Sequence, residues 1–235
     1  MTWLSNLAHR FDRPAELDAE TRTRVGAWRA SRAGDLKKPL SQTRWVVVDT
    51  ETTGLDPTRD RLLSIGACAI TDRALALDDS FLVPIRQTRV SADENILIHG
   101  IGGQTQLSGM DEAEALGRFL EYAGRDILVA YHATFDQQML AVAMRERIGV
   151  AFKPKWLDVA KLCDVLFPAK AREIKHLDDW LEHFGIVQHA RHNAVADAFC
   201  TAELLLVLLA EAERQGMLST QSLVRAEHLH HWLKR

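Results

Sequence analysis

The feature that most constrains the fold is a series of three strand-like segments placed ahead of any alternation of strand and helix. Residues 45–50 form the short β-branched apolar run WVVVDT, and LLSIGACAI and SFLVPI follow at hairpin-like distances. The turn signals Asp56-Pro57 and Asp78-Asp79 separate the three segments. We therefore expect the sheet to open with three strands joined by short connections.

Further along the chain, helical and strand-like periodicities alternate. Two helices are predicted to end at Gly124 and Gly149, with the buried strand DILVAY between them, and Thr134 with Gln137 has the form of a capping box at the start of the second helix. The remaining predicted elements are a short strand at 156–158 and helices at 159–167, 175–184 and 194–214. This order predicts an α/β fold in which helices flank one sheet.

Charge divides the 235 residues into segments of opposite sign. The first 44 residues hold nine Lys and Arg against five Asp and Glu, so they carry +4, and the remainder carries −7 of the total −3. This balance excludes the strongly basic histone-like class. We predict a basic, partly helical extension at 1–43, with a helix at 16–30 that breaks at Ser31, a main body at 44–213 and a helical tail at 214–235.

No apolar run is long enough for a membrane span, and the N-terminus lacks the apolar region of a secretory signal. We therefore expect a cytoplasmic protein with no membrane partner. The three cysteines are far apart, without a CxxC motif, and are expected to be reduced core residues.

Two acids stand at the end of the first strand. Side chains at i and i+2 leave the same face of a strand, so Asp49 and Glu51 point together into one small region. A lone pair of this kind is usually a solvated strand end. Here Thr52-Thr53-Gly54 follows, a small-residue turn through which the backbone could approach a ligand closely.

A third acid, Asp136, lies in the first turn of the helix that follows DILVAY, where open α/β sheets gather their sites. A fourth, Asp197, lies in HNAVAD, where Asn193 is predicted to cap the long helix and His192 to lie in the loop before it. The other histidine-rich segment, residues 228–231, carries no accompanying carboxylate or cysteine pattern and is read as solvated.

These residues form a chemically coherent set. Four carboxylates suit two hard divalent cations, Mg²⁺ or Mn²⁺, which can activate a water molecule and stabilise the leaving oxygen of a phosphoryl displacement. A histidine beside them could accept the proton of that water.

The segments VDTETTGL, IHGI at 98–101, AYHATFDQQML and HNAVADA together resemble, in order and spacing, the DEDDh group of 3′–5′ exonucleases, which includes proofreading ε subunits. The resemblance covers about residues 45–209. It implies a ribonuclease H-like mixed sheet, flanked by helices, whose first three strands are antiparallel. It further implies that Asp49, Glu51, Asp136 and Asp197 bind the metals and that His192 is the general base.

The resemblance also implies substrate contacts by Thr52, Leu55, His99 and Phe135, although Leu55 and Phe135 also fit a core role and His99 a loop position. The implied partner is nucleic acid with a free 3′ end, single-stranded and DNA rather than RNA, together with a replication or repair protein. Two other classes stay open at this point. One is a non-catalytic nucleic-acid or polymerase-binding module on the same fold, and the other is a zinc hydrolase that uses the histidine-rich tail.

Overall fold

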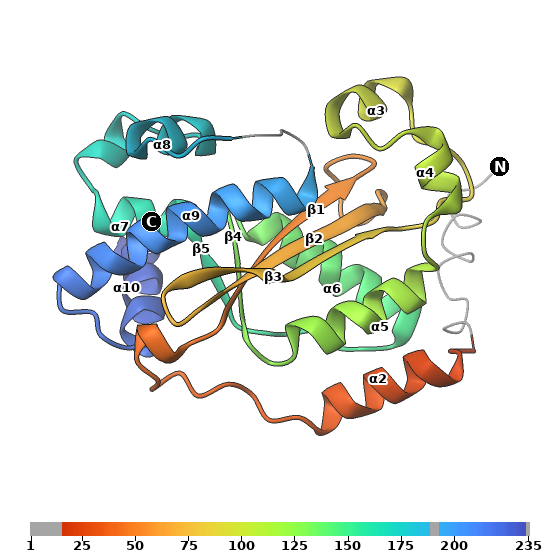
Figure 1. Ribbon diagram of the computed structural model, residues 1–235, viewed down its shortest axis with the longest axis horizontal. Helices are drawn as coiled ribbons and strands as arrows, with labels where there is room; N and C mark the ends of the chain where they lie inside the picture. The colour runs from red at the N-terminus through yellow and green to blue at the C-terminus, as the bar shows by residue number, and fades with distance from the viewer. Residues whose placement is uncertain (1–15, 189–192, 234–235) are drawn as a thin grey trace.

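The structure is a computed structural model that describes residues 16–188 and 193–233 of the chain. Figure 1 shows one sheet with helices on both faces. The strands are β1 (Trp45–Thr52), β2 (Leu62–Thr71), β3 (Ala74–Pro84), β4 (Ile127–Ala130) and β5 (Trp156–Asp158). The α-helices are α2 (Ala19–Ala30), α3 (Asp93–His99), α4 (Gly103–Ser108), α5 (Glu112–Ala123), α6 (Thr134–Ile148), α7 (Val159–Leu166), α8 (Leu177–Phe184), α9 (Ala194–Arg214) and α10 (Thr220–Leu233), and the 3-10 turns are η1 (Leu40–Gln42) and η2 (Lys170–Arg172).

The sheet has the strand order β3-β2-β1-β4-β5, with β1 in the middle. The first three strands are antiparallel, as predicted, and β4 and β5 run parallel to β1. The predicted turn at Asp78-Asp79 is wrong, because both residues lie inside β3. The turn is instead made by Asp72 and Arg73, at φ 52° and 63°. Arginine rarely adopts this left-handed conformation, so its residue type gave no signal of the turn.

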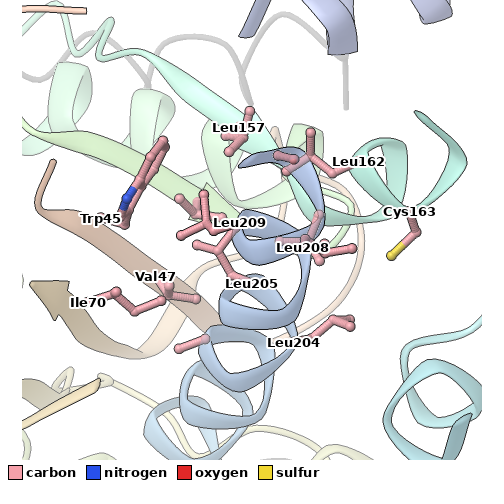
Figure 2. Close-up of a cluster of buried hydrophobic side chains, with 14 of the residues drawn as sticks. Trp45, Val47, Ile70, Leu157, Leu162, Cys163, Leu204, Leu205, Leu208 and Leu209 are labelled. Carbon is pink, nitrogen blue, oxygen red and sulfur yellow. The ribbon is translucent and has the colours of Figure 1, made fainter. Parts of the chain in front are cut away.

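Alternation along β1 sends its side chains into two separate cores. Val46 and Val48 face α5 and α6, in the core that also contains Phe119. Trp45 and Val47 face the opposite core, beneath α9, where Figure 2 shows them beside the leucines of that helix. The helices on both faces of the sheet therefore pack against β1, and this packing holds β1 at the middle of the molecule.

Most predicted helix ends agree with the structure. Gly124 and Gly149 end α5 and α6, and α9 spans the predicted residues, with Asn193 as its N-cap. Two predicted helices begin later than expected, at Ala19 and Leu177. For the first of these helices the reason is local, because Asp18 accepts a hydrogen bond from the Thr21 amide at 2.8 Å and so caps it there.

The basic extension packs against the body through α2. Val25 and Trp28 are buried in the core beneath α5, and the Trp28 indole donates a 2.6 Å hydrogen bond to the carbonyl of Gly124. The connector that follows runs along the lower edge of the sheet to β1 (Figure 1). There the hydroxyls of Thr43 and Thr220 are 2.7 Å apart, so the extension and the tail contact each other.

The three cysteines are free and buried, as expected of reduced core residues. None of the helices that the structure describes combines the length and the apolar character needed to span a membrane.

Candidate active site

Asp49 and Glu51 lie at the end of β1 on the side of the strand that faces α9, following Trp45 and Val47 on the same face. Both side chains are only partly buried. A register shift between Glu51 and Thr52 ends the regular pairing with β2 immediately afterwards. The two carboxylates therefore leave the sheet where its regular hydrogen bonding stops.

Asp197 reaches the same place from the first turn of α9. Its Oδ2 accepts a 3.2 Å hydrogen bond from the backbone amide of Asn193, whose own side chain accepts one from the Ala196 amide. Its Oδ1 accepts a 3.0 Å hydrogen bond from Nε2 of Gln188. Donors on both oxygens fix the orientation of this carboxylate. Gln188 belongs to no motif in the sequence, so its contact with Asp197 could not be predicted.

A close approach between α9 and β2 brings Asp197 beside β1. Gly66 pairs with Asp49 across the two strands, and a Cβ at Gly66 would lie 2.2 Å from the carbonyl carbon of Ala194 and 2.3 Å from the amide of Val195. Only glycine permits the start of α9 to lie so near the sheet. Gly66 is therefore a site-forming residue that the sequence analysis missed, because its importance depends on a contact far along the chain.

Asp136 comes from the opposite layer of the fold. It is buried in the first turn of α6, and its Oδ1 accepts a 2.8 Å hydrogen bond from the hydroxyl of Thr50. Thr50 lies between the two acids of β1 and points to the α6 side of the sheet, so it links the motif on β1 to the acid on α6. The sequence analysis passed over this threonine.

The turn before α6 does not use the predicted capping box. Thr134 is the first helical residue, and the N-cap position is Ala133, which makes no side-chain cap. The chain enters the helix instead through His132 at φ 58°, whose amide donates a 3.1 Å hydrogen bond to Oδ1 of the buried Asp158. A contact with the end of β5 thus holds the turn before α6, and the helix itself begins without a side-chain cap.

The site gathers negatively charged side chains in a small volume. Carboxylate oxygens of Asp49, Glu51 and Asp197 lie within 4.8 Å of one another. Burial, followed by the charges of Asp136, Glu51 and Asp197, raises the pKa of Asp49 well above its usual value. Burial, with the charges of Asp197 and Asp136, raises the pKa of Glu51 to about 7. Burial likewise raises the pKa of Asp136 to about 7, although the Thr50 hydrogen bond lowers it.

The four residues predicted to contact substrate occupy different environments. Leu55 is 85% exposed, so the alternative core role is wrong for it, whereas Phe135 packs at the edge of the α5 and α6 core. Thr52 donates a 2.7 Å hydrogen bond to the Gly54 carbonyl and so shapes the turn after β1. His99 is the buried last residue of α3, which excludes the alternative loop position.

The predicted general base, His192, lies outside the described residues. In the histidine-rich tail, the side chains of residues 230 and 231 lie outside them as well. Within the described part of the chain, the cluster with metal-ligand geometry is the one formed by Asp49, Glu51 and Asp197.

An open sheet flanked by helices, with acids gathered at the end of its central strand, defines the ribonuclease H-like class of folds. The RNase_T exonuclease family profile matches residues 46–205, and the chain belongs to this family. This membership confirms the resemblance to the DEDDh 3′–5′ exonucleases.

Several known proteins are similar to the chain. A DNA polymerase III subunit epsilon-like protein of Rhodobacter capsulatus is 33% identical over 182 residues, covering 76% of this chain and 25% of the relative. The DNA polymerase III subunit epsilon of Buchnera aphidicola is 28% identical over 180 residues, covering 72% of this chain and 74% of that protein. A PolC-type DNA polymerase III of Thermotoga petrophila is 28% identical over 173 residues, covering 74% of this chain and only 12% of the polymerase.

Solved structures agree on the fold. E. coli exonuclease I in complex with a dT13 oligonucleotide has a TM-score of 0.64 at 17% identity, covering 74% of this chain and 42% of that enzyme. Exonuclease X in complex with 5′ overhanging duplex DNA has a TM-score of 0.60 at 18% identity, covering 78% of this chain and 99% of the other.

Proposed function

We propose that the protein is a 3′–5′ exonuclease that hydrolyses phosphodiester bonds at the 3′ end of a nucleic acid and releases nucleoside monophosphates. The observation that carries this proposal is the group of carboxylates at the end of β1, whose oxygens lie within 4.8 Å of one another. Membership in the RNase_T exonuclease family supports the same reaction class. A module that only bound nucleic acid would have no physical need to hold these repelling charges together.

The donor set fits hard divalent cations. Carboxylate oxygens are the ligands that Mg²⁺ and Mn²⁺ prefer, and the burial and mutual repulsion that raise the pKa values of Asp49 and Glu51 make their ionised forms costly unless a cation binds between them. The residues that would hold two such ions are Asp49, Glu51, Asp136 and Asp197. When bound, the ions would supply Lewis-acid stabilisation of the phosphoryl displacement.

The chain's own residues orient these ligands and move the proton. Gln188 and the Asn193 amide hold Asp197, and Thr50 holds Asp136. His192 would accept the proton of the attacking water as a neutral imidazole, so the rate should rise with pH through the histidine pKa. This role rests on the resemblance alone. His192→Ala is expected to lower the rate by about 10²–10⁴-fold while metal binding persists.

We favour single-stranded DNA over RNA as the substrate and a replication or repair protein as the partner. The support is indirect: the structural neighbour exonuclease I holds a dT13 oligonucleotide, and the relatives carry polymerase III names. Because the match covers only 12% of the Thermotoga petrophila polymerase and 25% of the Rhodobacter capsulatus relative, the substrates and assemblies of these relatives are only proposals for this chain. The exposure of Leu55, four residues after Glu51 in the chain, supports its predicted substrate contact.

The test is the release of mononucleotides from 5′-labelled oligonucleotides with Mg²⁺, with Mn²⁺ and with chelator, for the wild type and for Asp49→Ala. We expect stepwise shortening from the 3′ end that needs the ion and disappears in Asp49→Ala. No release under any condition would favour the binding module, and release that survives Asp49→Ala would favour the zinc hydrolase. Matched DNA and RNA ends, single-stranded and duplex, decide the substrate.

A further inference from the structure

A basic cavity of about 250 Å³ opens where the connector after α2 meets the starts of β1 and β4. Lys38 lines it from the connector, and Lys153 and Lys155 line it from the segment before β5. Its lining also includes Arg44 and Arg125 together with two acids, Asp35 and Asp126, which gives an excess of three positive charges. In a chain whose net charge is −3, this is a strong local reversal of sign.

The excess charge resides on the lysines. Arg44 is bound to Asp79 and Asp126 at 2.7 and 2.9 Å, so its charge is already balanced. Among the side chains that the structure describes, in 16–188 and 193–229, no ion pair to Lys38, Lys153 or Lys155 is found, and all three lysines are exposed. These side chains are therefore available to an anionic group from outside.

A second cavity, of about 310 Å³, connects this basic region with the helix that carries Asp136. The two cavities share Pro154 and Lys155 in their linings. The second is also lined by Ala133, Thr134 and Gln137, from the turn that begins α6, and by Asp158 and Glu227, which pair with Lys161 at 3.3 and 3.4 Å. Thr134 lies in the same first turn of α6 as Asp136, so a strand that followed both cavities along the β5 edge of the sheet would reach the turn that carries this acid.

We propose that Lys38, Lys153 and Lys155, named here the lysine strip, bind the phosphodiester backbone of a single nucleic-acid strand several nucleotides away from its reacting 3′ end. This inference rests on the proposed function and extends it to a second contact with the same substrate. Lysine ammonium groups are compact charges with rotatable donors, which suit phosphates at variable positions. The strip thus supplies attraction that the acidic body lacks, because the carboxylates of the site repel a polyanion.

An acidic protein segment would meet the same three charges. The nucleic-acid strand is favoured because the two cavities lead from the lysine strip to the start of α6, where the reacting end would lie. A protein that docked on the lysine strip would not need a second cavity leading from it to α6.

The test compares two full-length triple variants with the same loss of charge. One is K38Q/K153Q/K155Q, and the control is K37Q/K170Q/R172Q, whose residues lie outside both cavities. Binding of 5′-fluorescein dT20 is followed by anisotropy in chelator, from low to moderate salt. Each phosphate contact contributes about −0.7 to the slope of log affinity against log salt for single strands, so the strip variant should flatten the slope by about 2. The control should keep the wild-type slope.

Three outcomes would overturn the proposal, and a fourth would refute only the proposed function on which it rests. Equal flattening in both variants would mean a general field effect, and no flattening in either would mean that the strip does not touch the strand. Polyglutamate that binds the wild type but not the strip variant, with an unchanged dT20 slope, would identify an acidic-protein dock instead. A wild type that binds dT20 but never shortens it under activating ions would refute the proposed exonuclease without affecting the slope comparison.

Discussion

The two ends of β1 carry charged residues in opposite electrostatic states. At the beginning, Arg44 donates hydrogen bonds to Asp79 and Asp126 at 2.7 and 2.9 Å, and its guanidinium lies 5.0 Å from the centre of the Tyr122 ring. The hydrogen bonds from Arg44 hold the pKa of Asp79 below its usual value. This end is balanced, and its charges hold β1, β3 and α5 together.

At the other end, Asp49 and Glu51 meet Asp136 and Asp197 with no described cation between them, and burial with mutual repulsion raises the pKa of Asp49. The same residue type therefore shifts in opposite directions at the two ends of one strand. The difference teaches that acids paired with arginine serve stability, whereas acids gathered against one another mark a site that is completed by something bound. Four predictions address this difference.

The largest effect is expected for Asp49→Asn. Removing one charge from the unbalanced end should reduce exonuclease turnover at least about 30-fold, which corresponds to about 2 kcal/mol of barrier, because the metal ligands are no longer complete. The free energy of unfolding without metal should stay equal or rise, since a repelling charge is gone. Steady-state kinetics and urea unfolding measure the two quantities, and a destabilised but active variant would place Asp49 among the balanced residues instead.

The second effect is a pH dependence of stability in the metal-free protein. The pKa values of Glu51 and Asp136 are raised to about 7, so the folded state binds more protons than the unfolded state between about pH 4 and pH 7. Stability should therefore fall as pH rises through this range, by on the order of 2–4 kcal/mol. Urea unfolding at pH 5 and pH 8 measures the fall, and saturating Mg²⁺ should reduce it.

The matched control is Glu51→Gln, which should flatten the dependence. Equal slopes for this variant and the wild type would show that the cluster does not govern the pH response.

A smaller effect is expected where α9 approaches β2. In Gly66→Ala the new methyl group would overlap the backbone of Ala194, so α9 must shift, at about 1–3 kcal/mol of stability, and Asp197 would move with it. Turnover should fall as well. The control is Gly26→Ala, whose methyl group meets nothing within 4 Å on an exposed helical position, and it should raise stability by about 0.5–1 kcal/mol. Thermal melts that rank the two variants in the opposite order would contradict the packing account.

The smallest effect belongs to the balanced end. Arg44→Gln should lower the free energy of unfolding by about 1–2 kcal/mol, because Asp79 and Asp126 lose their charged partner. Turnover by the folded variant should stay near that of the wild type. The exposed pair of Arg73 and Glu213 provides the control, since Arg73→Gln should change stability by less than about 1 kcal/mol. A loss of turnover in Arg44→Gln without loss of stability would break the contrast between the two ends.

The sequence predicted the parts of this site that local pattern controls. The β-branched run before Asp49, the cap at Asn193 and the glycines that end α5 and α6 all act over a few residues, and the structure places them as expected. The α/β fold class followed from the same periodicity, and the antiparallel pairing of the first three strands followed from the family resemblance.

The sequence did not predict what depends on distant partners. The approach of Gly66 to α9, the donation from Thr50 to Asp136 and the hold of Gln188 on Asp197 each join segments that no local period relates. The capping box expected at Thr134 is wrong because Thr134 is the first residue of α6 and Ala133 occupies the N-cap position, after a turn that His132 joins to the distant Asp158.

The most direct test of the central claim is calorimetric titration of the metal-free protein with Mn²⁺ at pH 8, in the wild type and in Asp49→Asn. The account predicts two ions per wild-type chain, and at least tenfold weaker binding or loss of an ion in the variant, because the unbalanced end of β1 supplies the ligands. Absence of Mn²⁺ binding by the folded wild type, or equal isotherms for the two proteins, would contradict it.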